Sequence, residues 1–479
     1  MRTSYTALLL AASAMLGTAA QASEVKRDIY YGVMLIDPES ETRQPDSFIA
    51  VEDGKIVEIG RGLPEDTSHS NLHDHSGQFA LPGLIDTHAH MTWGPLNFEV
   101  NDGVPKMIIE DRSDITAFNA RQLLSFGVTT VRSPAGDTTA NRDYTQMRAE
   151  GELIGPEAFL AGEVIDQNPI EVDGPIMKPG PDLGIGDIVQ RQSDAGATFI
   201  KLYTGLSEQE LAEGIEAAHA QGLQAIAHLG DVSWTAAAKL GIDALVHMMP
   251  VSPDLLPADA RENFLATRRP GSFEFFEWYE VADFDAPPMQ EMIDTLAEKQ
   301  VYAEATLGAF KPAFFGDKPD VVDIGMEYAH PDSLNNWRTL FRFDLGWQAS
   351  DYERAQAVWP KLLELTKRMY EAGVPMTIGT DLANPYVAPG ISMSREMILH
   401  REAGIPAWAV LRMATIEGAR LLKIDSRTGR LEAGYEADIL FVGADPVHDF
   451  ANLEQVRAVL SDGTLFDPAK IRQANGEMK

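Results

Sequence analysis

The stretch Pro82-Gly83-Leu84-Ile85-Asp86-Thr87-His88-Ala89-His90 has the pattern of a buried strand that carries two imidazoles to its end. Side chains alternate between the two faces of a strand, so His88 and His90 point the same way, with Asp86 one step deeper on that face. Two neutral imidazoles side by side are typical ligands of a zinc-type ion. The spacing alone is weak evidence, because His73-Asp74-His75 repeats it among polar residues, where we expect a solvated loop.

Apolar runs of strand length recur along the middle of the chain, and most are separated by segments in which apolar residues return every three or four positions. This alternation predicts an α/β fold, a (β/α)₈ TIM-type barrel, whose chemistry lies at the C-terminal ends of the strands. The helical segments are Glu208–Ala220, Met289–Lys299, Tyr352–Ala372 and Ile391–Ala403. The eight strands are Leu84–His88, Val128–Arg132, Ala158–Ala161, Phe199–Tyr203, Ala225–His228, Ala244–His247, Val301–Thr306 and Met376–Asp381.

Both ends of the chain have a different pattern, that of short strands joined by tight turns. Asp53-Gly54 and Asp462-Gly463 each lie between two apolar runs, as in a two-residue hairpin. We therefore expect residues 23–82 and 426–479 to form one small β-sandwich domain, with the barrel at 83–425 between them. The first strands expected are Asp28–Ile36 and Phe48–Ile59.

The charge balance limits the partners. The 479 residues include 39 Lys and Arg against 72 Asp and Glu, a net charge of −33, which would repel nucleic acid or an anionic membrane. The acidic residues are scattered, so we assign them to solubility. The chain has no cysteine, which excludes disulfides and leaves histidine, carboxylate and lysine as metal ligands.

Residues 1–22 have the pattern of a secretory signal peptide. Arg2 precedes an apolar run at 7–15, and Ala20-Gln21-Ala22 is a small-x-small cleavage pattern. We expect cleavage after Ala22 and a periplasmic or secreted protein. No later stretch approaches the roughly 20 apolar residues of a membrane span, so no membrane insertion of the mature protein is expected.

Ionisable residues gather at the predicted strand ends. His228, His247 and Asp381 each close an apolar strand, and Lys201 lies within Phe199–Tyr203, where a lone ammonium would be costly to bury. Each has an ordinary alternative: a hydrogen-bonded core histidine, a salt-bridged lysine or a helix-capping aspartate. Because five strands bring such groups to one rim, the set favours a site.

Together with the opening stretch, this ordered set resembles the amidohydrolase superfamily. The tail strengthens the resemblance, since Ala414-Thr415, Ala419–Leu422 and Gly429–Leu440 look like that family's return into its small β-sandwich. The similarity covers nearly the whole mature chain. Within the superfamily, the chain is similar to exported relatives of imidazolonepropionases and Xaa-Pro dipeptidases.

The resemblance implies a metal-dependent hydrolase of amide, dipeptide-like or cyclic amide C–N bonds in a small-molecule substrate. It implies two divalent metal ions, with Zn²⁺ the first choice, although some relatives use one ion. The implied ligands are His88, His90 and Asp381 for the first ion, His228 and His247 for the second, and Lys201, in N6-carboxylated form, for both.

The implied nucleophile is a hydroxide bridging the two ions, because metal binding lowers the pKa of water to about 7. Asp381 would be the catalytic residue that takes its proton and passes it to the leaving nitrogen, and Asp86 would orient a histidine ring. Tyr203 is a candidate donor to the substrate carbonyl, with ordinary barrel packing as the alternative. Arg132 is a candidate for a substrate carboxylate, with a structural ion pair as the alternative.

Two long insertions follow His247 and Thr306 and are rich in aromatic residues. Segments of this length are often lids, and their aromatic content favours an apolar substrate group; an interface in a homo-oligomer explains it equally. His330 lies in the second insertion and is a further candidate for substrate binding. The aromatic residues are Phe273, Phe275, Phe276, Trp278 and Tyr279 in the first insertion, and Phe310, Phe314, Phe315, Trp337 and Trp347 in the second.

Three other functions fit parts of this pattern. An esterase or lactonase would use the same site, since an activated water attacks any such carbonyl. A catalytically inactive scaffolding member of the superfamily is disfavoured because every ligand position is filled. Periplasmic metal storage is disfavoured because Asp381 is placed for proton transfer.

Overall fold

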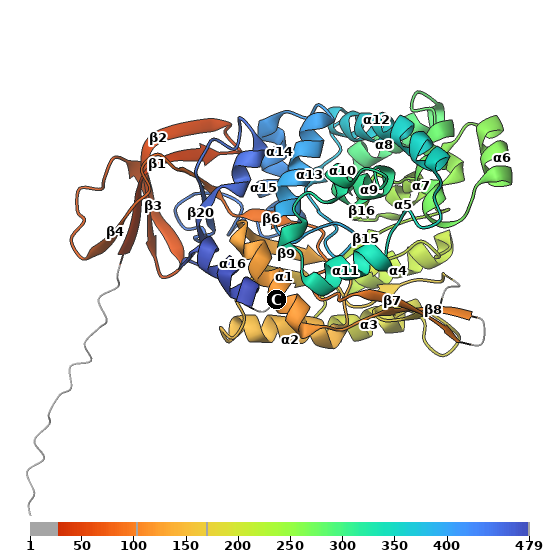
Figure 1. The fold of residues 1–479 in the computed structure, drawn as a ribbon, viewed down its shortest axis with the longest axis horizontal. Helices are drawn as coiled ribbons and strands as arrows, with labels where there is room; N and C mark the ends of the chain where they lie inside the picture. Colours follow the sequence, from red (N-terminus) through yellow and green to blue (C-terminus); the bar gives the residue numbers. More distant parts are fainter. Residues whose placement is uncertain (1–26, 102–103, 169–170, 478–479) are drawn as a thin grey trace, which may run out of the picture.

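The computed structural model describes residues 27–101, 104–168 and 171–477, and its large α/β body lies beside a smaller β-sheet domain (Figure 1). All eight predicted strands are present in the large body. Every residue of β9 and β14 is buried, as expected where helices cover one face of a parallel sheet and side chains fill the other. The strands are β6 (Leu84–Asp86), β9 (Val128–Ser133), β10 (Glu157–Leu160), β14 (Phe199–Leu202), β15 (Gln224–Ala227), β16 (Ala244–Val246), β17 (Tyr302–Glu304) and β18 (Met376–Thr377).

The strands close into a barrel. Parallel pairing joins β6, β9 and β10 in one sheet and continues from β14 to β18 in another. Backbone hydrogen bonds connect the two sheets on both sides, from Thr198 N to Leu160 O (2.9 Å) and from Thr87 N to Ile378 O (3.0 Å). The predicted (β/α)₈ barrel is confirmed.

Helices follow the strands and cover the barrel. The predicted helix Glu208–Ala220 has the same bounds in the structure, because Ser207 and Glu210 form a capping box at its start. The covering helices are α1 (Ser113–Ser125), α2 (Thr138–Ala149), α3 (Ile185–Asp194), α4 (Glu208–Ala220), α5 (Trp234–Leu240), α8 (Pro287–Lys299), α12 (Ala349–Glu371) and α13 (Ile391–Glu402), followed by α14 (Ala407–Met413) and α15 (Ile416–Leu421).

Strands from both chain ends form one eight-stranded sheet, seen at the left of Figure 1. The two predicted Asp-Gly turns pack against each other: a Cβ on Gly463 would lie 2.4 Å from Gly54 Cα, so this approach needs glycine. The strands are β1 (Arg27–Asp37), β2 (Thr42–Glu52), β3 (Lys55–Arg61), β4 (Ser70–Asp74), β5 (Phe79–Pro82), β19 (Ile439–Val442), β20 (Val456–Ser461) and β21 (Thr464–Phe466).

The last helix, α16 (Pro468–Glu477), departs from the predicted sandwich. It packs on α1 of the barrel, where Asn475 Oδ1 accepts a hydrogen bond from Arg121 Nε (2.8 Å) and Asn475 Nδ2 donates to Phe118 O (3.2 Å). The C-terminal segment therefore returns to the barrel. The predicted signal peptide at 1–22 lies outside the described residues.

The His73–His75 segment is not the solvated loop that we expected. Residues 70–74 form β4, paired parallel with β1, and His73 stacks on Tyr30 with ring centroids 4.6 Å apart. His75 is buried, with its ring 4.2 Å from that of Phe441. The His75 ring thus lies in the interior of the small domain, whereas His73 is part-exposed and its Nε2 lies 2.7 Å from Asp28 Oδ1.

Further elements lie at the C-terminal mouth of the barrel. A three-stranded sheet of β7, β8 and β12 lies there, and helices fill the two long insertions. These elements are β7 (Leu96–Asn101), β8 (Val104–Ile109), β11 (Val164–Ile165), β12 (Glu171–Asp173), β13 (Ile176–Met177), α6 (Ala258–Thr267), α7 (Glu274–Val281), α9 (Leu307–Phe314), α10 (Pro319–Val322) and α11 (Pro331–Thr339).

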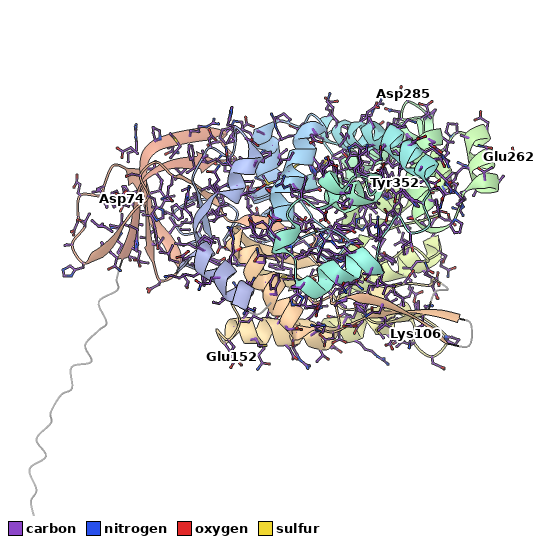
Figure 2. All side chains as sticks on the ribbon, viewed as in Figure 1. Asp74, Lys106, Glu152, Glu262, Asp285 and Tyr352 are labelled. Carbon is purple, nitrogen blue, oxygen red and sulfur yellow. The ribbon has the colours of Figure 1, made fainter. Side chains whose placement is uncertain are left out.

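Most aromatic residues of the insertions are structural. Phe276, Trp278 and Phe314 are 0% exposed and belong to the main core, so they form neither a mobile surface nor an interface. By contrast, acidic side chains such as Glu152, Glu262 and Asp285 point outward from separate parts of the surface (Figure 2). Within the described ranges, no helix combines the length and apolar character needed to cross a bilayer.

Candidate metal centre

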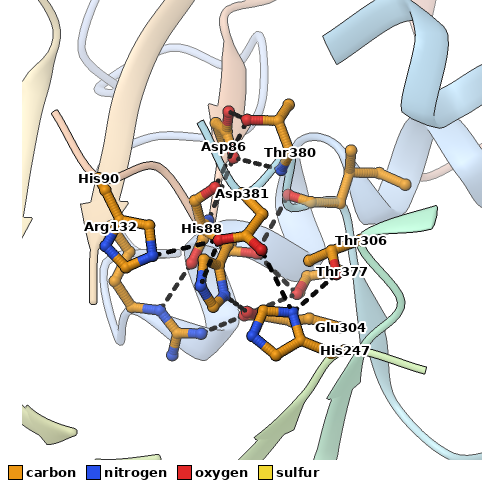
Figure 3. Close-up of polar contacts among 12 residues, drawn as sticks. Asp86, His88, His90, Arg132, His247, Glu304, Thr306, Thr377, Thr380 and Asp381 are labelled. Atoms are coloured by element: carbon orange, nitrogen blue, oxygen red, sulfur yellow. Dashed lines mark hydrogen bonds and ion pairs between the residues drawn. The ribbon is translucent and has the colours of Figure 1, made fainter. Parts of the chain in front are cut away.

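His88 and His90 follow β6 after a bend at Thr87, beside the segment that follows β18. His90 N donates a hydrogen bond to Leu382 O (2.8 Å), which holds the two segments together. Their Nε2 atoms lie 3.3 Å and 3.1 Å from Asp381 Oδ1 (Figure 3). The structure thus brings both imidazoles of the opening stretch to one carboxylate.

Asp381 reaches the two rings because β18 passes close to them. A Cβ on Gly379 would lie 2.6 Å from His88 Cβ, so glycine is needed at this crossing. Asp381 itself has a positive φ of 62° and donates its N–H to His88 O (2.7 Å). This backbone geometry turns the carboxylate into the barrel mouth.

His247 enters from the end of β16 and completes a compact cluster. One ligand atom each from His88, His247 and Asp381 lie within 4.8 Å of one another. The His247 Nδ1 atom lies 2.8 Å from Thr306 Oγ1, and Glu396 accepts the backbone N–H groups of residues 307 and 308 at 2.9 and 2.6 Å. Helix α13 therefore holds the start of α9, and with it the threonine that contacts the imidazole.

His228 and Lys201 lie on the neighbouring strands. The His228 ring is 4.4 Å from the His247 ring and 4.9 Å from the Tyr203 ring, centroid to centroid. Lys201 is 1% exposed at the end of β14 and lines the same cavity as His228. The strand-end residues predicted as ligands therefore converge at one mouth.

Several polar atoms in this cluster have no hydrogen-bond partner. In the described part of the chain, the buried side-chain atoms without one include His88 Nε2, His228 Nδ1, Lys201 Nζ and Asp381 Oδ1. A buried polar group left unpaired costs roughly 1–3 kcal/mol, and several together are rare in a folded core. The ligand atoms of His88, His247 and Asp381, which lie within 4.8 Å of one another, fit a divalent cation.

Burial sets the protonation of these groups. It lowers the pKa of His90 to about 4 and that of His228 to about 3, so both imidazoles are neutral at pH 7 and offer a lone pair. Burial also lowers the pKa of Lys201 to about 7, which leaves a large share of the amine uncharged. The cluster therefore carries less positive charge than its composition suggests.

Glu304 is a site residue that the sequence analysis missed. At the end of β17 and 0% exposed, it lies 3.0 Å from His88 Nδ1 through Oε2 and pairs through Oε1 with Arg132. This contact points the other ring nitrogen of His88 toward Asp381. A lone acid inside an apolar strand, the same signal that identified Lys201, could have found it.

Asp86 does not orient a ring, contrary to expectation. Its Oδ1 accepts the backbone N–H groups of His88 (3.1 Å) and Thr380 (3.0 Å), and its Oδ2 accepts Thr380 Oγ1–H (2.7 Å). Asp86 therefore ties the end of β6 to the end of β18. Glu304, and not Asp86, contacts the second ring nitrogen of His88 and orients that ring.

Arg132 lies beneath the cluster and not on the cavity wall. Its Nε donates to Thr87 O (2.8 Å) and its Nη2 pairs with Glu304, with the guanidinium 1% exposed. It is 1% exposed and does not line the cavity, so it is not placed to contact a substrate carboxylate there. The structural ion pair is the alternative that fits this position.

His330 lies at the start of α11, outside the cavity above the cluster. It caps α11, where its Nδ1 accepts the Asp332 N–H (3.2 Å), and its ring packs edge-on against Phe118. It does not line the cavity above the cluster. It lines a smaller hollow together with Trp93 and Leu96, which also line the cavity, so its role in substrate binding stays a prediction.

A cavity of about 240 Å³ opens above the cluster, with Tyr203 in its wall. Its floor is formed by His90, Lys201, His228, His247 and Asp381. The rest of its lining is mainly apolar: Trp93, Leu96, Met107, Ile109, Val164, Ile176, Phe275, Phe310, Phe341 and Phe343, with Asp166, Asn168 and Asn384 among them.

A (β/α)₈ barrel with a histidine and aspartate cluster at its C-terminal mouth is typical of metal-dependent hydrolases. A model of the Amidohydrolase family matches residues 79–252 and 346–466. The chain belongs to the amidohydrolase family, and it is an enzyme of that family.

Known proteins are similar to this chain over part or most of its length. A 5-methylthioadenosine/S-adenosylhomocysteine deaminase of Moorella thermoacetica (strain ATCC 39073 / JCM 9320) is 24% identical over 459 residues, or 90% of each chain. An imidazolonepropionase of Alkaliphilus metalliredigens (strain QYMF) is 24% identical over 274 residues, covering 47% of this chain and 63% of the relative. A solved Xaa-Pro dipeptidase with bound methionine superposes with a TM-score of 0.66 at 22% identity, covering 92% of this chain and 100% of the other.

Proposed function

We propose that this enzyme hydrolyses the C–N bond of an amide, cyclic amide or dipeptide-like substrate with the help of bound divalent metal. One observation carries the proposal: His228, Lys201 and Asp381, each with a side-chain atom that has no hydrogen-bond partner, lie at the floor of a cavity large enough for a small molecule, and the buried His88 Nε2 lies 3.3 Å from Asp381 Oδ1. When bound there, a divalent ion would polarise the scissile carbonyl and acidify a water molecule.

The chain's own residues supply the proton transfers. Asp381 lies among the ligands, where its carboxylate accepts the proton from the attacking water and returns it to the leaving nitrogen. Burial raises the pKa of Tyr203, so its hydroxyl stays protonated and donates a hydrogen bond to the carbonyl oxygen. The apolar wall above excludes bulk water from the reacting atoms.

We further propose two ions, preferably zinc, with Lys201 as a carbamate between them. An uncharged amine adds to carbon dioxide through a new N–C bond and loses a proton, and the lowered pKa of Lys201 supplies that amine at neutral pH. An ammonium at this position would repel the metal. The compact set of His88, His247 and Asp381 also suits a single ion. The measured number of metal ions bound per chain decides between one ion and two.

The test is metal analysis together with a substrate screen. Protein grown with bicarbonate and reconstituted with zinc, manganese or cobalt is assayed on dipeptides, N-acyl amino acids, lactams, lactones and 5-methylthioadenosine. We expect bound metal and hydrolysis of at least one C–N substrate. Turnover of lactones alone favours the esterase alternative, and protein without metal or activity favours a scaffolding role.

Export remains part of this proposal and rests on the sequence pattern at 1–22. Its test is the N-terminus of protein from the producing cell. Cleavage after Ala22 in a periplasmic or extracellular fraction supports export, and an intact N-terminus in the cytoplasm contradicts it.

A further inference from the structure

We infer that the substrate group held in the cavity is apolar, preferably aromatic, and carries no free carboxylate. This inference rests on the proposed function and narrows it. Three features of the cavity wall support it: its aromatic packing, its lack of a free cation, and the sign of the charges that remain.

Three phenylalanines from separate elements make one side of the cavity. The Phe275 ring lies edge-on to Phe310 and Phe343, with centroids 5.2 and 5.8 Å apart. These contacts fix the rings against one another. Met107 and Ile109 of β8 add a second apolar part of the wall. A group lying between these walls gains by burying apolar surface, and an aromatic ring adds edge or face contacts.

Among the described residues that line the cavity, Lys201 is the only lysine or arginine, and it lies at the floor. Arg342 lines an adjoining hollow, but Asp344 binds its guanidinium through two N–H groups, at 2.8 and 2.5 Å. The described wall therefore offers no free cation to pair with a carboxylate.

The charged groups that remain are acidic. Asp166 lines the cavity and is 2% exposed, with Oδ1 accepting Gly205 N–H (2.8 Å) and Gln167 N–H (2.9 Å). Glu274 lines the adjoining hollow, where its Oε1 lies 3.6 Å from Arg268 Nη1. A substrate carboxylate in the cavity would therefore face the Asp166 carboxylate in an environment of low dielectric constant, after approaching a chain of net charge −33. A dipeptide, which ends in a carboxylate, fits this wall poorly.

A matched pair of substrates tests the inference. N-acetylphenylalanine and N-acetyl-2-phenylethylamine share the scissile amide and the ring and differ by one carboxylate; N-acetylphenylalanine N-methylamide controls for size. With metal-loaded enzyme we expect kcat/KM to be at least about tenfold higher for both neutral compounds. Equal or faster hydrolysis of the carboxylate compound overturns the inference and leaves the proposed function intact.

A charge placed in the wall provides a second test. Met107→Lys should reduce the preference for neutral compounds about tenfold, whereas Met107→Leu should leave that ratio unchanged. A ratio that does not differ between the two variants counts against the inference.

If none of the three compounds is hydrolysed, the lack of turnover counts against the proposed function, and calorimetric titration of the same compounds tests the inference separately. Binding of the neutral pair at least about tenfold tighter supports it. Equal or tighter binding of the carboxylate compound, or no binding of any compound, overturns it.

Discussion

Replacing Glu304 by glutamine should lower both the free energy of unfolding and the affinity for zinc, and the two effects can be measured separately. The Glu304 carboxylate is fully buried between His88 Nδ1 and the Arg132 guanidinium. Glutamine keeps nearly the same shape but removes the charge. The guanidinium then lacks its counter-ion, and His88 loses the anionic partner that orients its ring as a ligand.

The size of each effect follows from the burial of the pair. Removing one partner of a buried ion pair costs about 3–5 kcal/mol, and because glutamine still accepts a hydrogen bond we expect about 3 kcal/mol, measured by urea unfolding of metal-free protein. Loss of a carboxylate behind a metal-binding histidine typically costs 10–100-fold in affinity, so the zinc Kd, measured by chelator competition, should rise by about tenfold or more.

A double variant separates the two effects. Adding Arg132→Met to Glu304→Gln removes the uncompensated charge, so most of the lost stability should return. The zinc affinity should stay low, because His88 still lacks its carboxylate. A zinc Kd within twofold of the parent in the single variant would refute the role assigned to Glu304.

Three further changes probe other parts of the account. Asp381→Asn should retain much of the metal but lower kcat/KM by about 10²-fold or more, and unchanged turnover would remove Asp381 from proton transfer. Lys201→Ala should lower the metal content to half or less, with partial rescue by short carboxylic acids, and full occupancy in that variant counts against a bridging carbamate. Burial raises the pKa of Glu396 to about 8 from an ordinary value of 4.5, so the folded chain holds a proton there that the unfolded chain has lost. The free energy of unfolding should therefore fall as pH rises through this window, and Glu396→Gln should flatten the decline in urea titrations at pH 5 and 8.

The barrel could be predicted because its strands are continuous apolar runs, buried on both faces, and because helices between them carry their own boundary signals. Ser207 and Glu210 mark the start of α4 in the sequence as clearly as in the structure. The hairpins at Asp53-Gly54 and Asp462-Gly463 were predictable for a similar local reason, since both residues of each turn adopt positive φ.

The side-chain partners could not be predicted because they depend on which strands face each other. Glu304 lies 216 positions from His88 along the chain, and only barrel closure brings them together. The same holds for Arg132, whose partner is also Glu304. His73 and His75 were misassigned because composition describes a polar segment, whereas their packing depends on Tyr30 and Phe441.

Anomalous diffraction from crystals grown with zinc would test the metal centre most directly. We expect a zinc peak within about 2.0–2.3 Å of ligand atoms of His88, His247 and Asp381. A second peak beside His228 and Lys201 would establish the two-ion site. Zinc bound only elsewhere, for example at His73 and His75, or no peak in fully loaded crystals, would contradict the assignment of this cluster as the metal centre.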